Sequence, residues 1–129
     1  VYMAMVFVDA PCSGSGAWRR HPDARWRLTL EQLATYNELQ DQVLDRGARY
    51  VSPGSRMIYA TCSLFTQENE ERVTAFLERH PEFSCVEWQD AWNDKLPPLD
   101  AVHGPGLRLS PADHGCDGFF AAVLVKSKG

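Results

Sequence analysis

The 129-residue sequence predicts one open α/β domain. Short apolar runs alternate with helical patterns along the chain, and the apolar runs end in polar turns that contain glycine or serine. The length allows one hydrophobic core but not two. Alternating strands and helices imply parallel strands joined by right-handed crossovers, and such sheets bind ligands beyond the carboxyl ends of their strands.

The first third of the chain predicts a strand, a loop and a helix. The apolar run at residues 2–8 is typical of a buried strand covered on both faces, and residues 12–28 form a loop rich in Gly, Ser and Arg. Thr29 with Gln32 predicts a capping box that opens a helix ending near Gly47. The predicted core face of this helix consists of Leu33, Tyr36, Leu39 and Val43.

A second strand and a second helix follow. Pro53-Gly54 predicts a turn, and residues 56–61 predict a second buried strand. A helix is expected to begin near Thr66 and to stop at His80-Pro81. Its predicted core face is Val73, Phe76 and Leu77, and Glu68, Glu70 and Glu71 should lie toward its positive end.

The last third predicts two further strands separated by a long loop. Residues 83–88 and 118–125 are the strands, and residues 89–117, rich in Pro, Gly and Asp, are the loop. A loop of that length within one domain is usually functional or mobile.

The net charge of −4 argues against binding nucleic acid through overall basicity. A local patch is still present, because arginines gather in residues 19–27 beside Trp18 and Trp26. The segment could contact phosphates and stack on bases, or it could be an ordinary solvated loop. No run is long enough to span a bilayer and none resembles a signal peptide, so no membrane association is expected. The chain starts at Val1 in an apolar run, which suggests truncation.

The four cysteines, Cys12, Cys62, Cys85 and Cys116, lack the C-x-x-C spacing of zinc knuckles and redox pairs. Free thiols in a reducing cytoplasm are therefore expected. Cys12 and Cys62 directly follow the first two strands and are each followed by Ser, so both should face one crevice. Cys85 is expected in the core, as free cysteines often are.

Three motifs resemble one family of enzymes. They are DAPCSGSGAWRRHPD at residues 9–23, YATCS at residues 59–63 and HGCDGFF at residues 114–120. Together they resemble the NOL/NOP/Sun family of RNA 5-methylcytosine methyltransferases, most closely the bacterial 16S ribosomal RNA branch. Cys116 departs from the pattern, since the family more often carries Thr there.

The resemblance implies the C-terminal half of a Rossmann-like class I methyltransferase domain that depends on S-adenosylmethionine. Residues 1–129 would supply strands four to seven of that fold with their flanking helices, in the spatial order four, five, seven, six. The N-terminal half that binds the cofactor would be absent, because no Gly-rich cofactor loop is found here. We therefore expect this fragment alone to be inactive and to self-associate through an exposed edge strand at residues 2–8.

The resemblance also implies roles for individual residues. Cys62 would be the nucleophile that attacks carbon 6 of cytosine, and Cys12 would assist release of the product. Asp9 would lie between cofactor and base and, if burial raised its pKa, could offer a proton to the ring, with Pro11 beside the cofactor. RNA, expected to be ribosomal RNA, would be held by Arg19, Arg20, His21 and Arg25.

Three alternatives remain open at this point. The chain could be a non-catalytic RNA-binding or assembly module whose cysteines are merely packed. It could be a cysteine hydrolase that uses His21 or His114, or a metal site built from Cys12, Cys62, Cys116 and His114. The segment from His114 to Gly118 could be a glycine turn, or Asp117 could shape the site.

Overall fold

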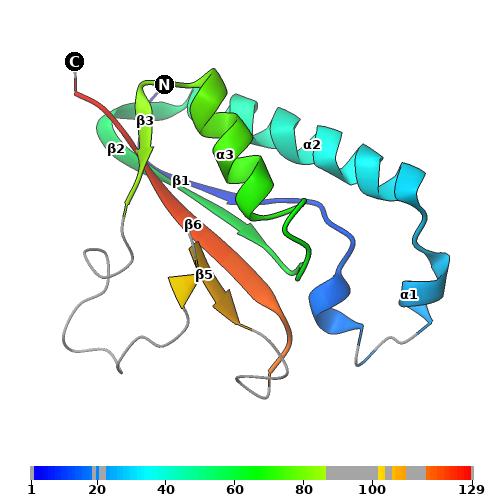
Figure 1. Cartoon of the computed structure of the whole chain (residues 1–129). Coiled ribbons are helices and arrows are strands. Elements are labelled where there is room, and N and C mark those ends of the chain that lie inside the picture. The colour runs from blue at the N-terminus through cyan, green and yellow to red at the C-terminus, as the bar shows by residue number, and fades with distance from the viewer. Residues whose placement is uncertain are drawn as a thin grey trace.

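A computed structural model describes residues 2–18, 20, 23–86, 102–103, 106–109 and 116–128. A six-stranded mixed sheet forms one layer, and two helices form a second layer on one of its faces (Figure 1). Strands β1 (Met3–Asp9) and β2 (Val51–Thr61) are parallel, and β6 (Phe119–Lys126) runs antiparallel to β2. Strand β3 (Phe83–Cys85) pairs antiparallel with the end of β6. The order β1-β2-β6-β3 agrees with the spatial order that the resemblance implies.

A short hairpin was missed by the sequence prediction. Strands β4 (Val102–His103) and β5 (Gly106–Leu109) lie within residues 89–117, where one long loop was expected. Strand β5 pairs with the beginning of β6, so β3 and β5 share the same edge of that strand at different ends. A Cβ at Gly106 would lie 2.4 Å from the Phe120 ring, so glycine lets the hairpin pack closely. Strands this short show too little alternation to be recognised in sequence.

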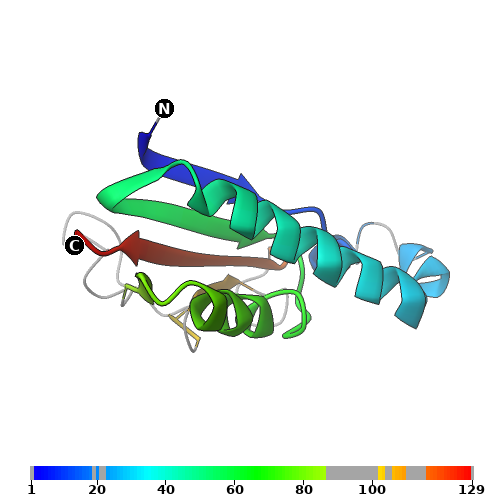
Figure 2. The same cartoon turned by 90° about the horizontal axis from the view of Figure 1, so that it is seen from above.

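Helix α2 (Leu30–Ala48) begins with the predicted capping box, in which Thr29 and Gln32 bond each other's backbone and side chain. Its predicted core face is wrong in the first half, because Leu39 is 38% exposed and only Val43 of the predicted set packs against the core. Figure 2 shows the reason: the N-terminal half of α2 extends past the sheet. The buried positions of α2 are Gln40, Leu44, Gly47 and Ala48.

Helix α3 (Glu70–Arg79) begins later than predicted, after turns at residues 66–69, and ends before His80 as expected. Val73 and Phe76 are fully buried and Leu77 packs against them, so its predicted core face is confirmed. Salt bridges from its outer face to α2 hold the two helices together: Arg72–Asp41 at 2.8 Å and Arg79–Asp45 at 2.9 Å.

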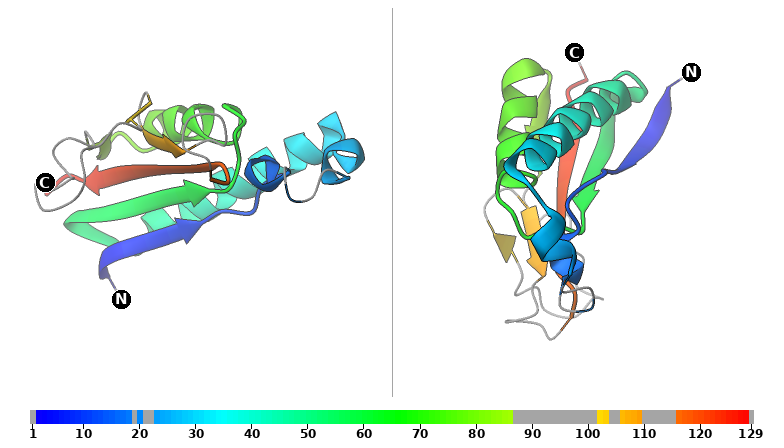
Figure 3. Two further views of the ribbon diagram at one scale, coloured as in Figure 1. Left: turned by 90° about the horizontal axis from the view of Figure 1, so that it is seen from below. Right: turned by 90° about the vertical axis from the view of Figure 1, so that its right-hand side faces the viewer.

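Strand β1 is covered on one face only, so the prediction of burial on both faces is wrong. Val8 is buried and Val6 half-buried, whereas Met5 and Phe7 are 58% and 60% exposed. Both α2 and α3 lie on the same side of the sheet (Figure 3), and β1 is its last strand. Among the described residues, therefore, none covers the side chains of β1 that point away from the helices.

The predicted turn at Pro53-Gly54 lies inside strand β2 as an irregularity. Met3 pairs with Val51 whereas Met5 pairs with Arg56, so residues 52–55 bulge out of register. Gly54 adopts a φ of 81°, a conformation that favours glycine. Among the helices described, none is both long and apolar enough to cross a membrane.

Candidate active site

Two thiols meet where β1 and β2 end. The Sγ atoms of Cys12 and Cys62 lie 3.4 Å apart, with Cys62 exposed and Cys12 half-buried. The parallel pairing that sets Asp9 opposite Ala60 continues as a hydrogen bond from Ala10 N to Ala60 O. This pairing is why the two loops leave the sheet side by side. The structure thus brings together the two cysteines that sequence reasoning placed in one crevice.

The surroundings of Cys12 hold its thiol in the neutral form. Burial raises the pKa of the Cys12 thiol to about 12, and the hydrogen bond with Cys62 and the negative charge of a Cys62 thiolate act in the same direction. Cys12 is therefore a neutral thiol at physiological pH. In that form it can donate its S–H to Cys62, which is the thiol open to solvent.

Glu68 lies fully buried beneath the two cysteine loops. Its carboxyl group accepts hydrogen bonds from Ser13 N at 2.8 Å and Ser13 Oγ at 2.5 Å, both in the loop that carries Cys12. It also accepts from Ser63 Oγ at 2.5 Å, next to Cys62, and from Gln40 Nε2 of α2 at 2.9 Å. One carboxyl group thus connects both cysteine loops to the helix layer.

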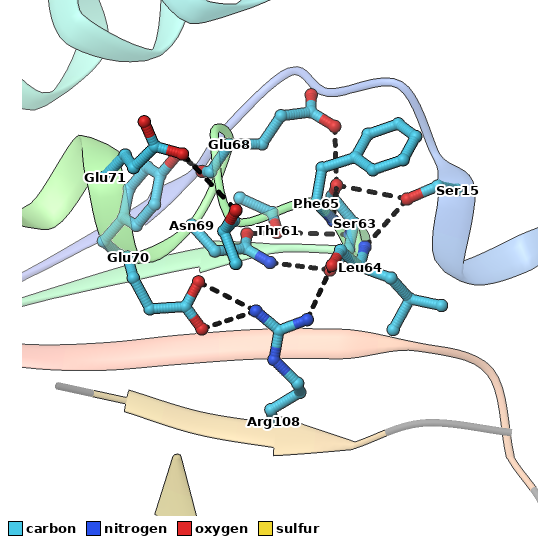
Figure 4. A network of polar contacts seen from close by, with 12 residues as sticks. Ser15, Thr61, Ser63, Leu64, Phe65, Glu68, Asn69, Glu70, Glu71 and Arg108 are labelled. Carbon is cyan, nitrogen blue, oxygen red and sulfur yellow. Dashed lines mark hydrogen bonds and ion pairs between the residues drawn. The ribbon is translucent and has the colours of Figure 1, made fainter. Parts of the chain in front are cut away.

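Three loops are further joined through backbone and hydroxyl contacts. Ser15 Oγ lies 3.2 Å from Ser63 Oγ and accepts from Leu64 N at 2.8 Å (Figure 4). Gly16 N donates to Cys62 O at 2.9 Å, and Gly118 N donates to Gly16 O at 2.8 Å. The segments that carried the three sequence motifs therefore converge at one place.

Gly16 and Gly118 serve close packing rather than an unusual backbone conformation. A Cβ on Gly16 would lie 2.3 Å from Gly118 O and 2.8 Å from Cys62 O. Positive φ in the described residues occurs at Gly14 and Gly54 and not at Gly118, which does not favour the alternative of a glycine turn there. Gly115 lies outside the described residues.

The loop after Cys62 is fixed from its other side. Thr61 Oγ1 donates to Asn69 Oδ1 at 2.5 Å, and Asn69 Nδ2 donates to Ser63 O at 2.9 Å. Arg108, on the unpredicted strand β5, donates to Leu64 O at 2.6 Å and pairs with Glu70 of α3 at 2.5 Å (Figure 4). These contacts keep the loop that carries Cys62 in place.

Asp9 is the last residue of β1, and Pro11 follows in the loop that leads to Cys12. Asp9 is exposed, so the burial that would favour proton donation from its carboxyl group is not found here. Pro11 is exposed as well, and its carbonyl accepts from Gln40 Nε2 at 2.9 Å. Both residues lie on the chain immediately before Cys12.

The arginine segment is the stretch of residues 19–27. Its arginines that the structure describes, Arg20, Arg25 and Arg27, are exposed and lie beside the crevice. Arg20 pairs with Asp117 at 2.5 Å. Arg27 is the last residue of the short helix α1 (Ala24–Arg27), and it pairs with Asp23, the residue just before that helix. The Arg25 guanidinium lies 4.8 Å from the centre of the Trp26 ring, which is 78% exposed. Arg19 and His21, also predicted to contact RNA, lie outside the described residues.

Trp18 anchors this segment to the crevice. Its ring meets that of Phe65 edge-on at 5.5 Å, just after the short helical turn η1 (Ser15–Ala17). An open hollow of about 710 Å³ extends from Ser13 along α1 and the start of α2, and Arg27 and Tyr36 line it. This hollow therefore joins Ser13, the neighbour of Cys12, to Arg27 of the arginine segment.

Sequence reasoning missed several residues that hold the site. Glu68 was expected at the positive N-terminal end of a helix. It precedes α3 instead, and its side chain is buried. Gln40 gave one usable signal, since it lies four residues before the buried Leu44 on the same face of α2. Asn69 and Arg108 showed no comparable signal, because their partners lie elsewhere in the sequence.

A metal centre finds no support in the described part of the chain, where no group of three His, Cys, Asp or Glu side chains could hold an ion. Cys116 is half-buried as a free thiol, and His114 lies outside the described residues. Cys85 is partly buried and packs against the core as expected.

Known proteins resemble this chain over nearly its whole length. Residues 2–125 match the family model described as 16S rRNA methyltransferase RsmB/F. The ribosomal RNA small subunit methyltransferase B of Vibrio cholerae is 39% identical over 121 residues, which are 94% of this chain and 25% of that protein. The chain thus spans about a quarter of the length of the curated relatives it matches.

Solved structures share the fold. The crystal structure of PH0851 matches with a TM-score of 0.80 and 38% identity, over 95% of this chain and 26% of that one. A methyltransferase homolog protein from Pyrococcus horikoshii matches with a TM-score of 0.73 and 26% identity, over 98% of this chain and 40% of that one. The mixed sheet with its flanking helices is therefore a Rossmann-like α/β fold of the kind found in methyltransferases.

Proposed function

Because this chain belongs to the RsmB/F family of 16S rRNA methyltransferases, we propose that it is part of an enzyme that methylates carbon 5 of a cytosine in RNA. The RNA is ribosomal RNA and the methyl donor is S-adenosylmethionine. The observation that carries this proposal is the 3.4 Å approach of the Cys12 and Cys62 sulfurs at the ends of two parallel strands.

The chemistry requires a nucleophile because carbon 5 of cytosine is too weakly nucleophilic to take a methyl group directly. The Cys62 thiolate adds to carbon 6, which breaks the aromaticity of the ring and makes carbon 5 nucleophilic. Carbon 5 then receives the methyl group from S-adenosylmethionine. A base, such as water at the exposed site, takes the proton from carbon 5, and the electron pair of that C–H bond restores the double bond to carbon 6 as Cys62 leaves as a thiolate. Cys62 is exposed, as attack on a base unstacked from its RNA strand requires.

Cys12 acts as a hydrogen-bond donor to Cys62. Its raised pKa keeps it protonated, so it stabilises the attacking thiolate and later the departing one.

The cofactor is proposed to lie near Asp9 and Pro11. The exposed carboxyl group of Asp9 at the open end of β1 suits a positively charged amine or sulfonium group. When bound, S-adenosylmethionine supplies the methyl group. We assign residues 1–129 to the C-terminal part of the catalytic domain and expect the N-terminal part to hold most of the cofactor, so this chain alone is inactive.

RNA is proposed to run along the arginine segment. Arg20 and Arg25, with Arg19 and His21 of the same segment, would contact phosphates, and the exposed Trp26 ring offers a surface for a base. Ser13, the neighbour of Cys12, and Arg27 of this segment line the same hollow.

The isolated chain is proposed to self-associate through β1. This strand is the end of the sheet and exposes Met3, Met5 and Phe7 on one face. Sedimentation of the isolated chain should show dimers or larger species, and Phe7→Lys should shift them toward monomer. A monomeric unchanged chain at micromolar concentration would contradict this.

The function is tested by trapping the full-length protein on ribosomal RNA that carries 5-fluorocytosine. Fluorine at carbon 5 cannot leave as a proton, so the covalent adduct should persist. The adduct should be lost in Cys62→Ala and should form in Cys85→Ala, which removes a core thiol away from the crevice. Methyl transfer that survives Cys62→Ala would favour the non-catalytic module whose cysteines are packed.

A further inference from the structure

The buried carboxyl group of Glu68 has no role in the chemistry proposed above. Burying an ionised carboxyl group is unfavourable unless other groups compensate for the lost water. Its partners are neutral donors, namely the Ser13 backbone, two serine hydroxyls and the Gln40 amide. Within the residues that the structure describes, no Lys, Arg or His side chain forms an ion pair with it.

Both oxygens of the Glu68 carboxyl group accept hydrogen bonds. Oε2 accepts from Ser13 N and Gln40 Nε2, and Oε1 accepts from the hydroxyls of Ser13 and Ser63. The orientation of the Gln40 amide is settled by its second contact, because the Pro11 carbonyl can only accept a hydrogen bond.

The residues that Glu68 contacts directly or through Gln40 flank the two cysteines. Pro11 and Ser13 are the neighbours of Cys12, and Ser63 follows Cys62 directly. Glu68 therefore contacts the Cys12 loop directly and through Gln40, and it contacts the Cys62 loop through Ser63. A shift of this carboxyl group would move one loop relative to the other.

We propose that Glu68 is a positioning residue, which sets the distance between the Cys12 and Cys62 sulfurs by holding both loops through one buried carboxylate. Its importance for catalysis rests on the proposed function, whereas its effect on the two thiols does not. The buried position of Glu68 is not explained by the dipole or the stability of α3, because Glu68 precedes α3 and its side chain faces the crevice loops.

The test measures the closeness of the sulfurs directly. Diamide oxidises the two thiols to a Cys12–Cys62 disulfide, taking up two electrons and two protons, and mass spectrometry of the full-length protein follows the rate. Glu68→Asp shortens the side chain and should slow disulfide formation about tenfold, since reaction rates fall steeply with misplaced partners. Glu68→Gln keeps the shape but replaces one acceptor oxygen by an NH2 group, and it should slow the reaction less than Glu68→Asp.

Two further variants provide a control and an independent check. Glu71→Gln is the matched control, because its carboxyl group is exposed on the same turn and contacts Thr66 rather than the cysteine loops. It should leave the disulfide rate unchanged. The double variant Ser13→Ala with Ser63→Ala removes the hydroxyls that contact Oε1 and should slow disulfide formation as Glu68→Asp does, without any change at Glu68.

Methylation provides the second readout. In the Glu68 variants kcat should fall about tenfold while KM for RNA stays within twofold, because the RNA contacts lie elsewhere. Unchanged disulfide rates in Glu68→Asp, Glu68→Gln and the double serine variant would overturn the proposal. If these rates fall but the unchanged protein forms no adduct with 5-fluorocytosine, the positioning role stands and the proposed function fails.

Discussion

Two adjoining parts of the chain are built in opposite ways. In the crevice, residues 10–16 and 61–69 are joined by short hydrogen bonds, with Glu68, Asn69 and Ser63 completely buried. A few residues further along, the arginine segment exposes most of its side chains, including 59% of Arg20 and 78% of Trp26. One part is fixed by buried hydrogen bonds, and the described residues of the other are exposed to solvent.

The difference suits the two tasks proposed for these regions. Attack on one carbon atom needs the sulfur held in place, whereas an RNA backbone can be contacted in many ways by mobile cations. The ion pairs Arg20–Asp117 and Arg27–Asp23 are solvent-exposed, and such pairs contribute little to stability. Phosphates can therefore compete for these arginines without disturbing the fold.

The largest expected effect is in the crevice, at Gly16. Gly16→Ala would place a methyl group 2.3 Å from the Gly118 carbonyl oxygen, which is backbone and cannot move aside cheaply. We expect about 3 kcal/mol or more of destabilisation, the range for severe overpacking. Thermal unfolding of the full-length protein, with alkylation of Cys62 as a local probe, measures it.

Gly14→Ala is the matched control two residues away. Gly14 has a φ of 74° but no atom within 4 Å of an added Cβ, so only backbone strain opposes the change. The expected destabilisation is about 1 kcal/mol. If both substitutions were equally mild, the crevice would not be as closely packed as described.

The smallest expected effect is in the arginine segment. Arg25→Ala should weaken RNA binding only a few-fold and lower the salt dependence by about one phosphate contact, because each such contact acts nearly independently. Melting temperature and Cys62 alkylation should stay unchanged. Filter binding at several salt concentrations measures the effect.

Arg49→Ala, an exposed arginine after α2, is the control for net charge. It should leave the salt dependence of RNA binding unchanged. An equal loss of RNA affinity in Arg25→Ala and Arg49→Ala would mean that the segment is no more than a solvated loop.

Local patterns in the sequence were enough to determine the main elements and the place of the two thiols. The capping box at Thr29 and Gln32, the core face of α3 and the strand order all follow from residues close together in the chain or from the motifs. Cys12 and Cys62 could be placed together because parallel strands end at the same edge of a sheet.

Only the tertiary structure decided what surrounds those thiols. Glu68 contacts Ser13 and Gln40, and Arg108 contacts Leu64, across long stretches of sequence. Such pairings produce no periodic pattern in the sequence, because each depends on how the helices and the β4–β5 hairpin pack on the sheet. The same holds for β1, whose apolar run is typical of a buried strand although both helices lie on one side of the sheet.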